Sequence, residues 1–579
     1  MSQEHQLNTM RHSASHVIAE AVLSIFPDAK FAIGPAIEDG FYYDFDLPRS
    51  LTPEDLPIIE KKMAEIIKAN LPFKHREISK AEAKKLFAKQ PYKLELIEEL
   101  PDDKVGIYEQ GNFIDLCKGP HVNTTGEIKA FKLTSIAGAY WRGDEHNAML
   151  QRIYGLAFNT QKELDDYLVH LEEIKKRDHR KIGKDLDLFV FSELVGKGLP
   201  LFTEKGSIIR RELERFVVDE ELKRGYKHIY TPDLALVALF KTSGHYPYYK
   251  DTMFPIMKVD DEELILRPMT CPHHYQYYAS RPRSYRELPF KIAELAKQFR
   301  YEKSGELTGL IRARMFCLAD SHIICQKEQA VSQINEVLDL IEYAAGVLYK
   351  NGAEYRYRLS LGDRKDDKKY YKDDEAWDYA ENVLRSVLKQ RGANFFEADD
   401  EAAFYGPKID IQMKNFAGKE DTAFTVQYDF VGPKRFKLTY IDTDGKEKEP
   451  IVIHRSSIGA IERTMAFLIE HYAGAFPTWL APVQVKLIPI SDRHIEHVKK
   501  VAAELKERGI RVETDDRSER MNLKIRQAQQ EKIPYMVVIG DKEAADNTVS
   551  VRKRSGEQLP VQPLANFIEM LTAEIANKA

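Results

Sequence analysis

A segment near the middle of the chain carries side chains that could grip a nucleoside triphosphate. Arg300 and Arg312 each present a planar guanidinium fork that suits phosphate oxygens. Glu302 can accept hydrogen bonds from an amine, and Phe316 offers a flat face on which a base can stack. The polar stretch 303–310 contains two glycines, which predicts a loop between two strands with both arginines on one side. Taken alone, the stretch would also suit a charged surface hairpin.

The same residues resemble a known signature. Phe-Arg-Tyr-Glu at 299–302, followed by Arg-Ala-Arg-Met-Phe at 312–316, is similar to the second motif of class II aminoacyl-tRNA synthetases. Residues 208–232 fit that family's first motif, a long helix leading to a strand that ends at a proline. Residues 459–471 fit the third, a glycine followed by a helix that carries Glu-Arg. Three motifs in this order are far more specific than any one of them.

The resemblance implies activation of an amino acid, in which its carboxylate attacks the α-phosphate of ATP. Positioning and charge neutralisation do most of this work. By resemblance, Arg300 holds the α-phosphate, and Arg312 and Arg463 hold the γ-phosphate. Phe316 then stacks on adenine, with Glu302 also at the ATP site. Mg²⁺ bound with ATP would bridge its phosphates.

A closer resemblance is to the threonyl-tRNA synthetases. Cys271, His322 and His454 match the positions at which that family holds one zinc ion per subunit. Three protein ligands leave positions open on such an ion. The amine and hydroxyl of L-threonine can both bind there, whereas the methyl group of valine cannot. The spacing of these three residues does not by itself predict a metal site, because they are far apart in the sequence.

The resemblance also assigns roles around the substrate. Asp320 would bind the amine or hydroxyl of threonine. His245 matches a histidine linked to transfer onto the tRNA ribose, as a general base. The matching positions in the wall of the active site are Met269, Tyr405, Lys408 and Gln427.

The chain departs from the family pattern near the zinc position. Leu318 replaces a polar pocket residue, Ala460 stands where a serine is usual, and Met315 replaces a glycine. These departures leave room for a catalytically impaired paralogue that acts as a tRNA binder or trans-editor, although the motif arginines are retained. A class II synthetase of another specificity is a further alternative, with prolyl the nearest in architecture. The cysteine and two histidines argue against it.

A second set of possible ligands lies near the N-terminus. His12 and His16 are four residues apart in a predicted helix, so they share one face. Cys117 and His121 follow much later as Cys-x-x-x-His. Two histidines with such a motif suit zinc. Two core histidines and an unrelated cysteine are the alternative.

This set resembles the editing domain that threonyl-tRNA synthetases share with alanyl-tRNA synthetases. Asp115 and Lys93 match further editing positions. In the threonyl family these residues position water and the substrate amine without metal, so the resemblance favours a metal-free site. Serine differs from threonine by one methyl, which binding discriminates poorly, so a second site that hydrolyses seryl-tRNA is needed.

Family members usually begin with a small ubiquitin-like domain, for which the sequence has no room before His12.

The composition is that of an ordinary globular protein. The chain has 579 residues, 43% of them hydrophobic and 31% charged, which suggests several domains. A formal net charge of −5 implies that any contact with RNA is a local patch. No apolar run approaches the roughly 20 residues of a membrane span. Four cysteines and the absence of a signal peptide favour a reducing compartment, so we expect a cytoplasmic protein without membrane contact.

The elements that must position these residues indicate an α+β multidomain protein. The expected parts are an α+β editing domain at 1–160, a linker helix at 161–183, a class II catalytic domain at 184–480 and a mixed α/β anticodon-binding domain at 483–579. The catalytic domain should be an antiparallel sheet flanked by helices. Its first motif matches the family's dimer surface, which implies a homodimer. Glu543 and Arg552 match positions that read the anticodon, which implies tRNA(Thr) as partner.

Overall fold

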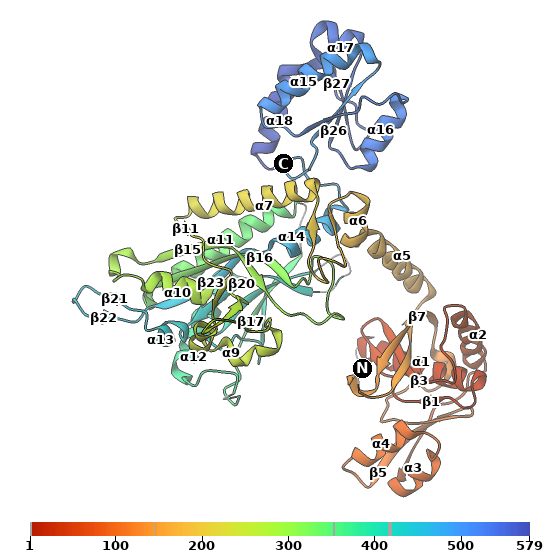
Figure 1. The fold of residues 1–579 in the computed structure, drawn as a ribbon. Helices are drawn as coiled ribbons and strands as arrows, with labels where there is room; N and C mark the ends of the chain where they lie inside the picture. Colours follow the sequence, from red (N-terminus) through yellow and green to blue (C-terminus); the bar gives the residue numbers. More distant parts are fainter. Residues whose placement is uncertain (1–2, 145, 351–353, 367, 415–417, 419) are drawn as a thin grey trace. The chain divides into compact units, whose positions relative to one another are not determined.

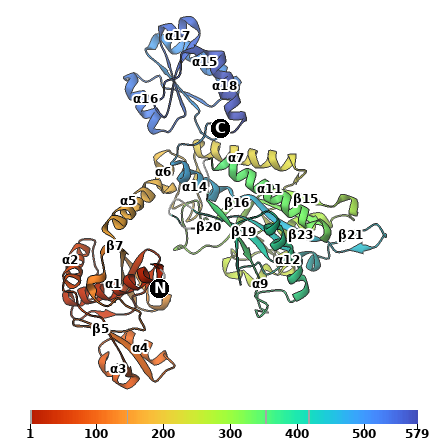
Figure 2. The ribbon, with the colours of Figure 1, turned by 180° about the vertical axis from the view of Figure 1, so that it is seen from behind.

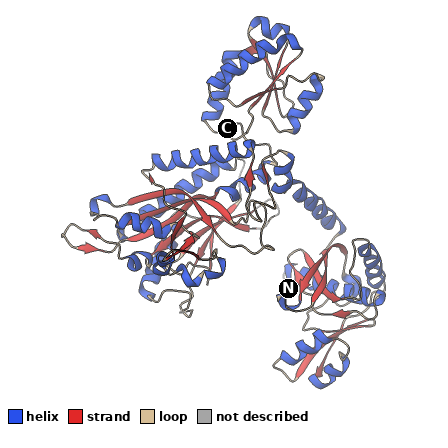
Figure 3. Ribbon diagram, viewed as in Figure 1, coloured by secondary structure: helices blue, strands red, loops and turns tan. Residues whose placement is uncertain are grey.

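The computed structural model describes residues 3–144, 146–350, 354–366, 368–414, 418 and 420–579. The chain divides into two compact units, Met1–Glu173 and Ile174–Ala579. Each unit has its own hydrophobic core, and each is described separately below. Figure 3 shows that both units combine helices with sheets, as the sequence predicted.

The N-terminal unit is built on two antiparallel sheets. The larger has the order β1-β3-β8-β7, with β2 (Ala36–Ile37) paired to β3, and the smaller has the order β4-β5-β6. The strand bounds are β1 Lys30–Phe31, β3 Gly40–Asp46, β8 Met149–Phe158, β7 Ala130–Tyr140, β4 Lys74–Ser79, β5 Lys104–Gln110 and β6 Phe113–Leu116. Helix α1 (Gln3–Ile25) packs on β3, because its apolar residues recur at the spacing of one helical face. These residues are Ala14, Val17, Ile18, Ala21 and Val22.

The second unit contains an eight-stranded sheet of order β11-β15-β16-β23-β20-β19-β17-β18. Its strands are β11 Lys227–His228, β15 Phe290–Phe299, β16 Met315–Cys325, β23 Ile451–Ala460, β20 Glu420–Asp429, β19 Lys408–Lys414, β17 Tyr355–Ser360 and β18 Phe395–Ala398. All neighbours are antiparallel except β11 with β15 and β17 with β18. Figures 1 and 2 show α7 (Glu204–Lys223) and α11 (Ala330–Leu348) side by side along this sheet.

The first-motif strand is shorter than the sequence suggested. Residues 226–232 were expected to form a strand that ends at a proline, yet only Lys227–His228 pair with β15. The backbone and hydroxyl of Thr231 instead donate to the carboxylate of Glu294, at 3.3 and 2.7 Å. The side chain of Glu294 therefore accepts the backbone N–H of Thr231 in place of a neighbouring strand.

Helix α7 is held to two other elements by buried ion pairs. Glu221 binds Arg455 of β23 at 2.5 Å, and both side chains are almost fully buried. Arg210 binds Glu462 at 2.7 Å, at the start of α14 (Ile461–Tyr472). The two contacts fix α7 against the strand and the helix that form the third motif.

The segment 161–185 forms two helices where the sequence suggested one. Helix α5 (Gln161–Arg177) ends before Asp178, and α6 (His179–Asp185) begins after it. Asp178 caps α6, because its side chain accepts a hydrogen bond from the backbone N–H of Arg180 at 2.8 Å. Asp178 has a φ of −50° and a ψ of 120°, outside the helical region, so it separates the two helices.

The last part of the chain is a five-stranded sheet of order β25-β24-β26-β27-β28. The strands are β25 Val512–Thr514, β24 Val485–Pro489, β26 Tyr535–Ile539, β27 Thr548–Lys553 and β28 Gln562–Pro563, and the helices are α15 Ile495–Glu507, α16 Met521–Gln530, α17 Asp541–Asp546 and α18 Leu564–Ala576. The alternation of strands and helices confirms the mixed α/β character predicted for this part of the chain. Helix α17 was not predicted.

Candidate active site

A cavity of about 600 Å³ in the second unit gathers most of the residues singled out from the sequence. Those lining it are His245, Met269, Cys271, Arg300, Glu302, Arg312, Phe316, Asp320, His322, Tyr405, Gln427, His454 and Arg463. Lys408 is not among the lining residues. Its ammonium group binds the carboxylate of Asp410 at 2.8 Å, inside the sheet. The structure thus brings together residues that are almost 220 positions apart in the chain.

The phosphate-binding candidates are placed by the hairpin of β15 and β16. Arg300 directly follows β15, and Phe316 is the second residue of β16, which pairs with Gln298. The guanidinium carbon of Arg300 lies 5.1 Å from the centre of the Phe316 ring. Arg463 reaches the same cavity from the first turn of α14. The predicted loop between two strands is confirmed by this hairpin.

Two of the three arginines lack an anionic partner. Within the described residues, neither Arg300 nor Arg463 forms an ion pair, and the guanidinium group of Arg300 makes only two long hydrogen bonds of 3.4 Å. Burial lowers the pKa of both guanidinium groups. The charges of Arg300 and Arg312 lower the pKa of Arg463 further. Such a concentration of uncompensated positive charge is suited to a polyanion.

Arg312 differs from the other two arginines. Its Nε atom binds the carboxylate of Glu302 at 3.0 Å, and about half of its side chain is exposed. The sequence suggested that these two residues contact ATP independently, yet the structure pairs them with each other. The carboxylate therefore holds Arg312 at the edge of the cavity.

The cysteine and the two histidines that resemble a zinc site meet at one end of the cavity. One ligand atom from each of Cys271, His322 and His454 lies within 4.8 Å of the others, and all three side chains are buried. Ligands around a tetrahedral zinc ion are separated by roughly 3.5 Å. Sulfur and imidazole nitrogen are ligands that zinc prefers. The residues present therefore fit zinc.

The neighbours of this cluster were not found from the sequence. His322 Nδ1 lies 2.8 Å from His274 Nδ1, and His454 Nε2 lies 2.9 Å from the carboxylate of Asp429. Tyr275 also donates to Asp429, at 2.7 Å. Each histidine of the cluster thus has one ring nitrogen engaged and one free for a metal, the arrangement usual around bound zinc. His274 and Tyr275 follow Cys271 on α10 (Cys271–Ala279), a proximity that could have flagged them.

The remaining substrate candidates surround the same cluster. Tyr405 donates a short hydrogen bond to Gln427, and its ring stacks on that of His454 with centres 4.9 Å apart. Asp320 accepts from Gln298 at 3.3 Å, and burial raises the pKa of its carboxyl group. Burial lowers the pKa of His245 to about 3, so this imidazole is neutral at pH 7.

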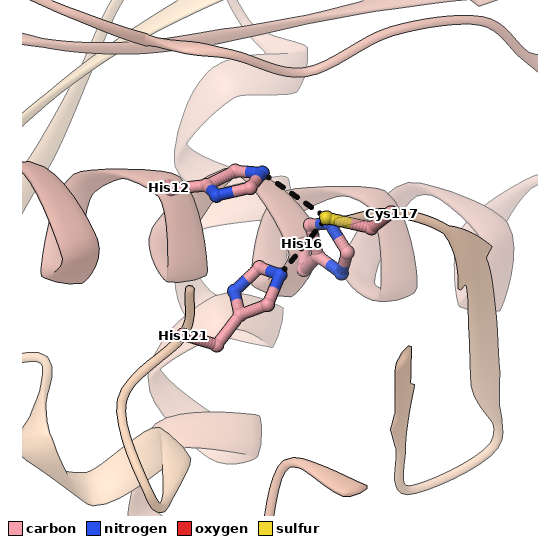
Figure 4. Close-up of side chains that lie close together, drawn as sticks. All are labelled: His12, His16, Cys117 and His121. Atoms are coloured by element: carbon pink, nitrogen blue, oxygen red, sulfur yellow. Dashed lines mark hydrogen bonds between the residues drawn. The ribbon is translucent and has the colours of Figure 1, made fainter. Parts of the chain in front are cut away.

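The N-terminal unit holds a second cluster, shown in Figure 4. His12 and His16 project from α1, and the sulfur of Cys117 lies 3.4 Å from His12 Nε2 and 3.3 Å from His121 Nε2. One ligand atom from each of the four residues lies within 4.8 Å of the others. Burial lowers the pKa of all three histidines and raises that of Cys117 to about 11. The cluster is therefore neutral at pH 7.

Asp115 connects this cluster to a buried lysine. Its carboxylate binds Lys93 Nζ at 2.5 Å, lies 3.6 Å from His16 Nε2, and accepts from the hydroxyl of Tyr43 at 2.6 Å. Lys93 and Asp115 are both almost fully buried. The structure thus brings all six editing candidates together, and it adds Tyr43, which the sequence did not indicate.

The two anticodon candidates lie in the C-terminal sheet domain. Glu543 is in α17 and accepts from the backbone N–H of Gly540 at 3.0 Å, so it caps that helix. Arg552 is on β27, and its buried Nε atom has no hydrogen-bond partner among the described residues.

Comparison with known proteins identifies the three parts of the chain. Family models match as "tRNA synthetase class II core domain (G, H, P, S and T)" at residues 254–472, "Anticodon binding domain" at 484–574, and "Threonyl and Alanyl tRNA synthetase second additional domain" at 105–154. A Threonine–tRNA ligase of Geobacillus sp. (strain WCH70) is 51% identical over 575 residues, which cover 98% of this chain and 89% of that protein. The chain belongs to the threonine–tRNA ligase family. A Threonine–tRNA ligase of Streptococcus pneumoniae (strain P1031) is 50% identical over 583 residues, which cover 100% of this chain and 90% of that protein.

Solved structures agree with this assignment. The RNA binding domain of threonyl-tRNA synthetase from Cryptosporidium parvum Iowa II matches with a TM-score of 0.66 at 35% identity, covering 69% of this chain and 98% of that one. Prolyl-tRNA synthetase from Giardia lamblia matches with a TM-score of 0.54 at 18% identity, covering 70% of this chain and 80% of that one, which shows a shared fold only. The predicted fold class and enzyme class are confirmed, and nothing in the comparisons supports an impaired paralogue.

Proposed function

We propose that the cavity of the second unit joins L-threonine to ATP and then transfers the threonyl group to tRNA(Thr). The observation that carries this proposal is the convergence of three arginines and a buried Cys-His-His cluster on one cavity. In the first step a carboxylate oxygen of threonine attacks the α-phosphorus, and pyrophosphate leaves. Neutralising the phosphate charge and aligning the two reactants account for most of the acceleration.

The arginine end of the cavity binds ATP. Arg300 holds the α-phosphate, and Arg463 holds the γ-phosphate from the start of α14. Arg312 leaves Glu302 to join Arg463 on the γ-phosphate, which frees the Glu302 carboxylate to accept from the adenine amine. Phe316, beneath the Arg300 guanidinium, stacks on the base. Mg²⁺ bound with ATP would offset part of the phosphate charge.

The other end of the cavity binds threonine. Cys271, His322 and His454 would hold one zinc ion per subunit, which as a Lewis acid supplies binding positions for the amine and hydroxyl of the substrate. Asp320 accepts a hydrogen bond from either group. The partly buried pair of Tyr405 and Gln427 closes the polar wall, and the fit rejects valine, which has no hydroxyl. Met269, of which part is exposed, contributes apolar surface for the methyl group.

The transfer step needs a group to accept the proton of the tRNA ribose hydroxyl. His245 is buried in the cavity wall, and its Nδ1 atom lies 2.8 Å from the hydroxyl of Ser243. Because the ring is neutral, a nitrogen can take up a proton as the ester bond forms and adenylate leaves. Lys408, bound to Asp410, pairs across the sheet with Gln427, the partner of Tyr405, and so supports the cavity wall rather than contacting the substrate.

The N-terminal cluster removes serine that has been attached in error. A neutral pocket of His12, His16, Cys117 and His121 can orient water against the ester of seryl-tRNA, and the Lys93–Asp115 pair can hold the serine amine. The close set of four ligand atoms would also fit zinc, and metal analysis separates the two cases.

Three further properties belong to the proposal. Glu543 and Arg552 contact the anticodon from the C-terminal domain. The chain forms a homodimer through the first-motif region, where Tyr230 is 92% exposed and Leu222, Leu234 and Leu236 are also exposed. The protein works in the cytoplasm, in line with four unpaired cysteines. Among the described residues, no helix has both the length and the low polarity that crossing a bilayer requires.

The test is ATP–pyrophosphate exchange on the purified protein with threonine, serine, valine and proline, beside metal analysis. We expect strong exchange with threonine, weaker exchange with serine, and about one zinc per chain in the catalytic domain. Arg300→Ala should abolish most of the exchange. Full exchange by Arg300→Ala, or no exchange with any of the four amino acids, would refute the proposal.

A further inference from the structure

A buried histidine outside the cavity connects the linker to the ATP-binding loop. His179 is the first residue of α6 and is 1% exposed. Its Nδ1 atom lies 2.7 Å from the carboxylate of Glu470 in α14. Its Nε2 atom accepts a hydrogen bond from the backbone N–H of Leu310 at 3.1 Å. One ring therefore joins α6, the third-motif helix and the loop between β15 and β16.

The two contacts define the protonation state of the ring. A backbone N–H can only donate, so Nε2 must carry a lone pair. The proton must then be on Nδ1, from which it is donated to Glu470. His179 is thus held as a single neutral tautomer, because each nitrogen has a partner of fixed character.

The loop held by His179 is a tight turn that ends at Arg312. Thr308 bonds to both Ile311 and Arg312 through the backbone, at 2.9 to 3.3 Å. Gly309 has a φ of +51°, and a Cβ atom there would lie 2.2 Å from His179 Nε2. The close approach of the turn to the imidazole therefore requires glycine. On the opposite side, Arg463 Nε donates to the carbonyl of Ile311 at 3.2 Å.

We propose that His179 is a positioning residue for ATP, which fixes the turn 308–312 and thereby sets where Arg312 can meet the γ-phosphate. Aspartate, histidine and glutamate at 178, 179 and 470 also lie close enough to suggest a metal site. Both nitrogens of the ring are already used in hydrogen bonds, which favours positioning. The inference rests on the proposed function, since it concerns how that ATP site is assembled.

Two substitutions separate the two hydrogen bonds of the ring. In His179→Gln the amide oxygen can reach the place of Nε2 and accept from Leu310. In His179→Asn the amide nitrogen can reach the place of Nδ1 and donate to Glu470. His179→Ala removes both bonds. Asp178→Ala is the matched control, because it removes the helix cap and a 3.9 Å contact with His179 Nδ1 while both hydrogen bonds of the ring remain.

The experiment is ATP–pyrophosphate exchange on the full-length protein, with ATP and threonine varied separately. We expect His179→Ala and His179→Asn to raise KM for ATP about tenfold, the effect of losing one hydrogen bond. KM for threonine should stay within about twofold. His179→Gln should recover KM for ATP to within about threefold, and Asp178→Ala should lower only the melting temperature.

Equal effects in all three His179 variants, or parallel rises in both KM values, would overturn the inference while leaving the proposed function intact. A wild-type protein without exchange would overturn both. If His179→Ala does not fold, Glu470→Ala and Glu470→Gln give the same comparison from the other side of the ring. The glutamine can still accept from Nδ1 and keeps the proton there. With alanine the proton can move to Nε2, which then no longer accepts from Leu310, so only Glu470→Ala should raise KM for ATP. A rise of the same size in both would again count against positioning by His179.

Discussion

Leu318 of β16 and Ala460 of β23 are paired directly across the sheet, and both line the cavity. They are also two of the positions at which the sequence departs from the polar residues of the family pattern. Residues paired across antiparallel strands have Cβ atoms roughly 5 Å apart and interact. The two departures therefore form one apolar patch and are best understood as a single change.

Restoring both polar residues should have a coupled effect on threonine binding. We expect Leu318→Gln and Ala460→Ser each to change KM for threonine by a few fold. The double variant should differ from the sum of the single variants by about 0.5–1 kcal/mol, since the residues touch. The measurement is threonine-dependent exchange for all four proteins. Strictly additive effects would show that the two sites act independently.

Removing the thiol of the proposed zinc site should remove the metal and the activity together. We expect Cys271→Ser to lose most of its zinc and to reduce threonine-dependent exchange by about 100-fold or more. Cys325→Ala is the matched control, because this cysteine is also buried and ends β16, the strand that carries His322, but lies outside the cluster. It should keep its zinc. Metal content by mass spectrometry, read beside exchange, would expose a Cys271→Ser protein that retains both.

The editing cluster can be disabled without affecting the synthetic site. Lys93→Met removes the ammonium group that pairs with Asp115, and an unpaired buried carboxylate remains. We expect hydrolysis of seryl-tRNA to fall at least 100-fold while threonine-dependent exchange stays within about twofold. Lys84→Met, which removes an exposed ion pair of the same unit, should change neither activity. Loss of exchange in Lys93→Met would show that the two activities are not separable.

Stability of the second unit should depend on the pair of Glu221 and Arg455. Glu221→Ala leaves the buried guanidinium uncompensated, which typically costs about 3–5 kcal/mol. Although burial alone would raise it, Arg455 holds the pKa of Glu221 below its usual value. The contribution of this ion pair to the free energy of unfolding is therefore complete above about pH 4.3, the pKa of glutamate in the unfolded chain. It is lost as the pH falls through the lower pKa of Glu221 in the folded protein.

Thermal melting at several pH values measures this effect. Asp185→Ala, which breaks the exposed pair with Lys181, is the control and should cost less than about 1 kcal/mol. Equal losses in the two variants would contradict the argument. The double variant Glu221→Leu/Arg455→Met should recover much of the loss, because no unpaired charge remains.

Local patterns in the sequence predicted the regular elements well. The helix that carries His12 and His16 and the alternation of strands and helices in the C-terminal domain were both predicted from local patterns. Helix α17 was missed because six residues between two strands give no periodic signal. The break at Asp178 was missed because the leucine spacing before it suggested a continuing helix, although aspartate is a common cap.

The site was predictable only in part. Cys271, His322 and His454 came from their resemblance to a family, since no spacing rule joins residues so far apart. Hydrogen bonds to the backbone leave no trace in the sequence, so the contact of His179 with Leu310 required the structure. The ion pair of Glu302 and Arg312 was likewise unforeseen, because each side chain has a separate expected role.

The position of helix α7 should affect the binding of both substrates. Its ion-pair partners Arg455 and Glu462 are next to His454 and Arg463 in the chain. One helix therefore helps to position both the threonine end and the ATP end of the cavity. A disturbance of α7 would displace these halves together. Substitutions in α7 would therefore make the enzyme behave as if both threonine and ATP were scarce. A substitution in the loop of Leu310 would make it behave as if ATP alone were scarce.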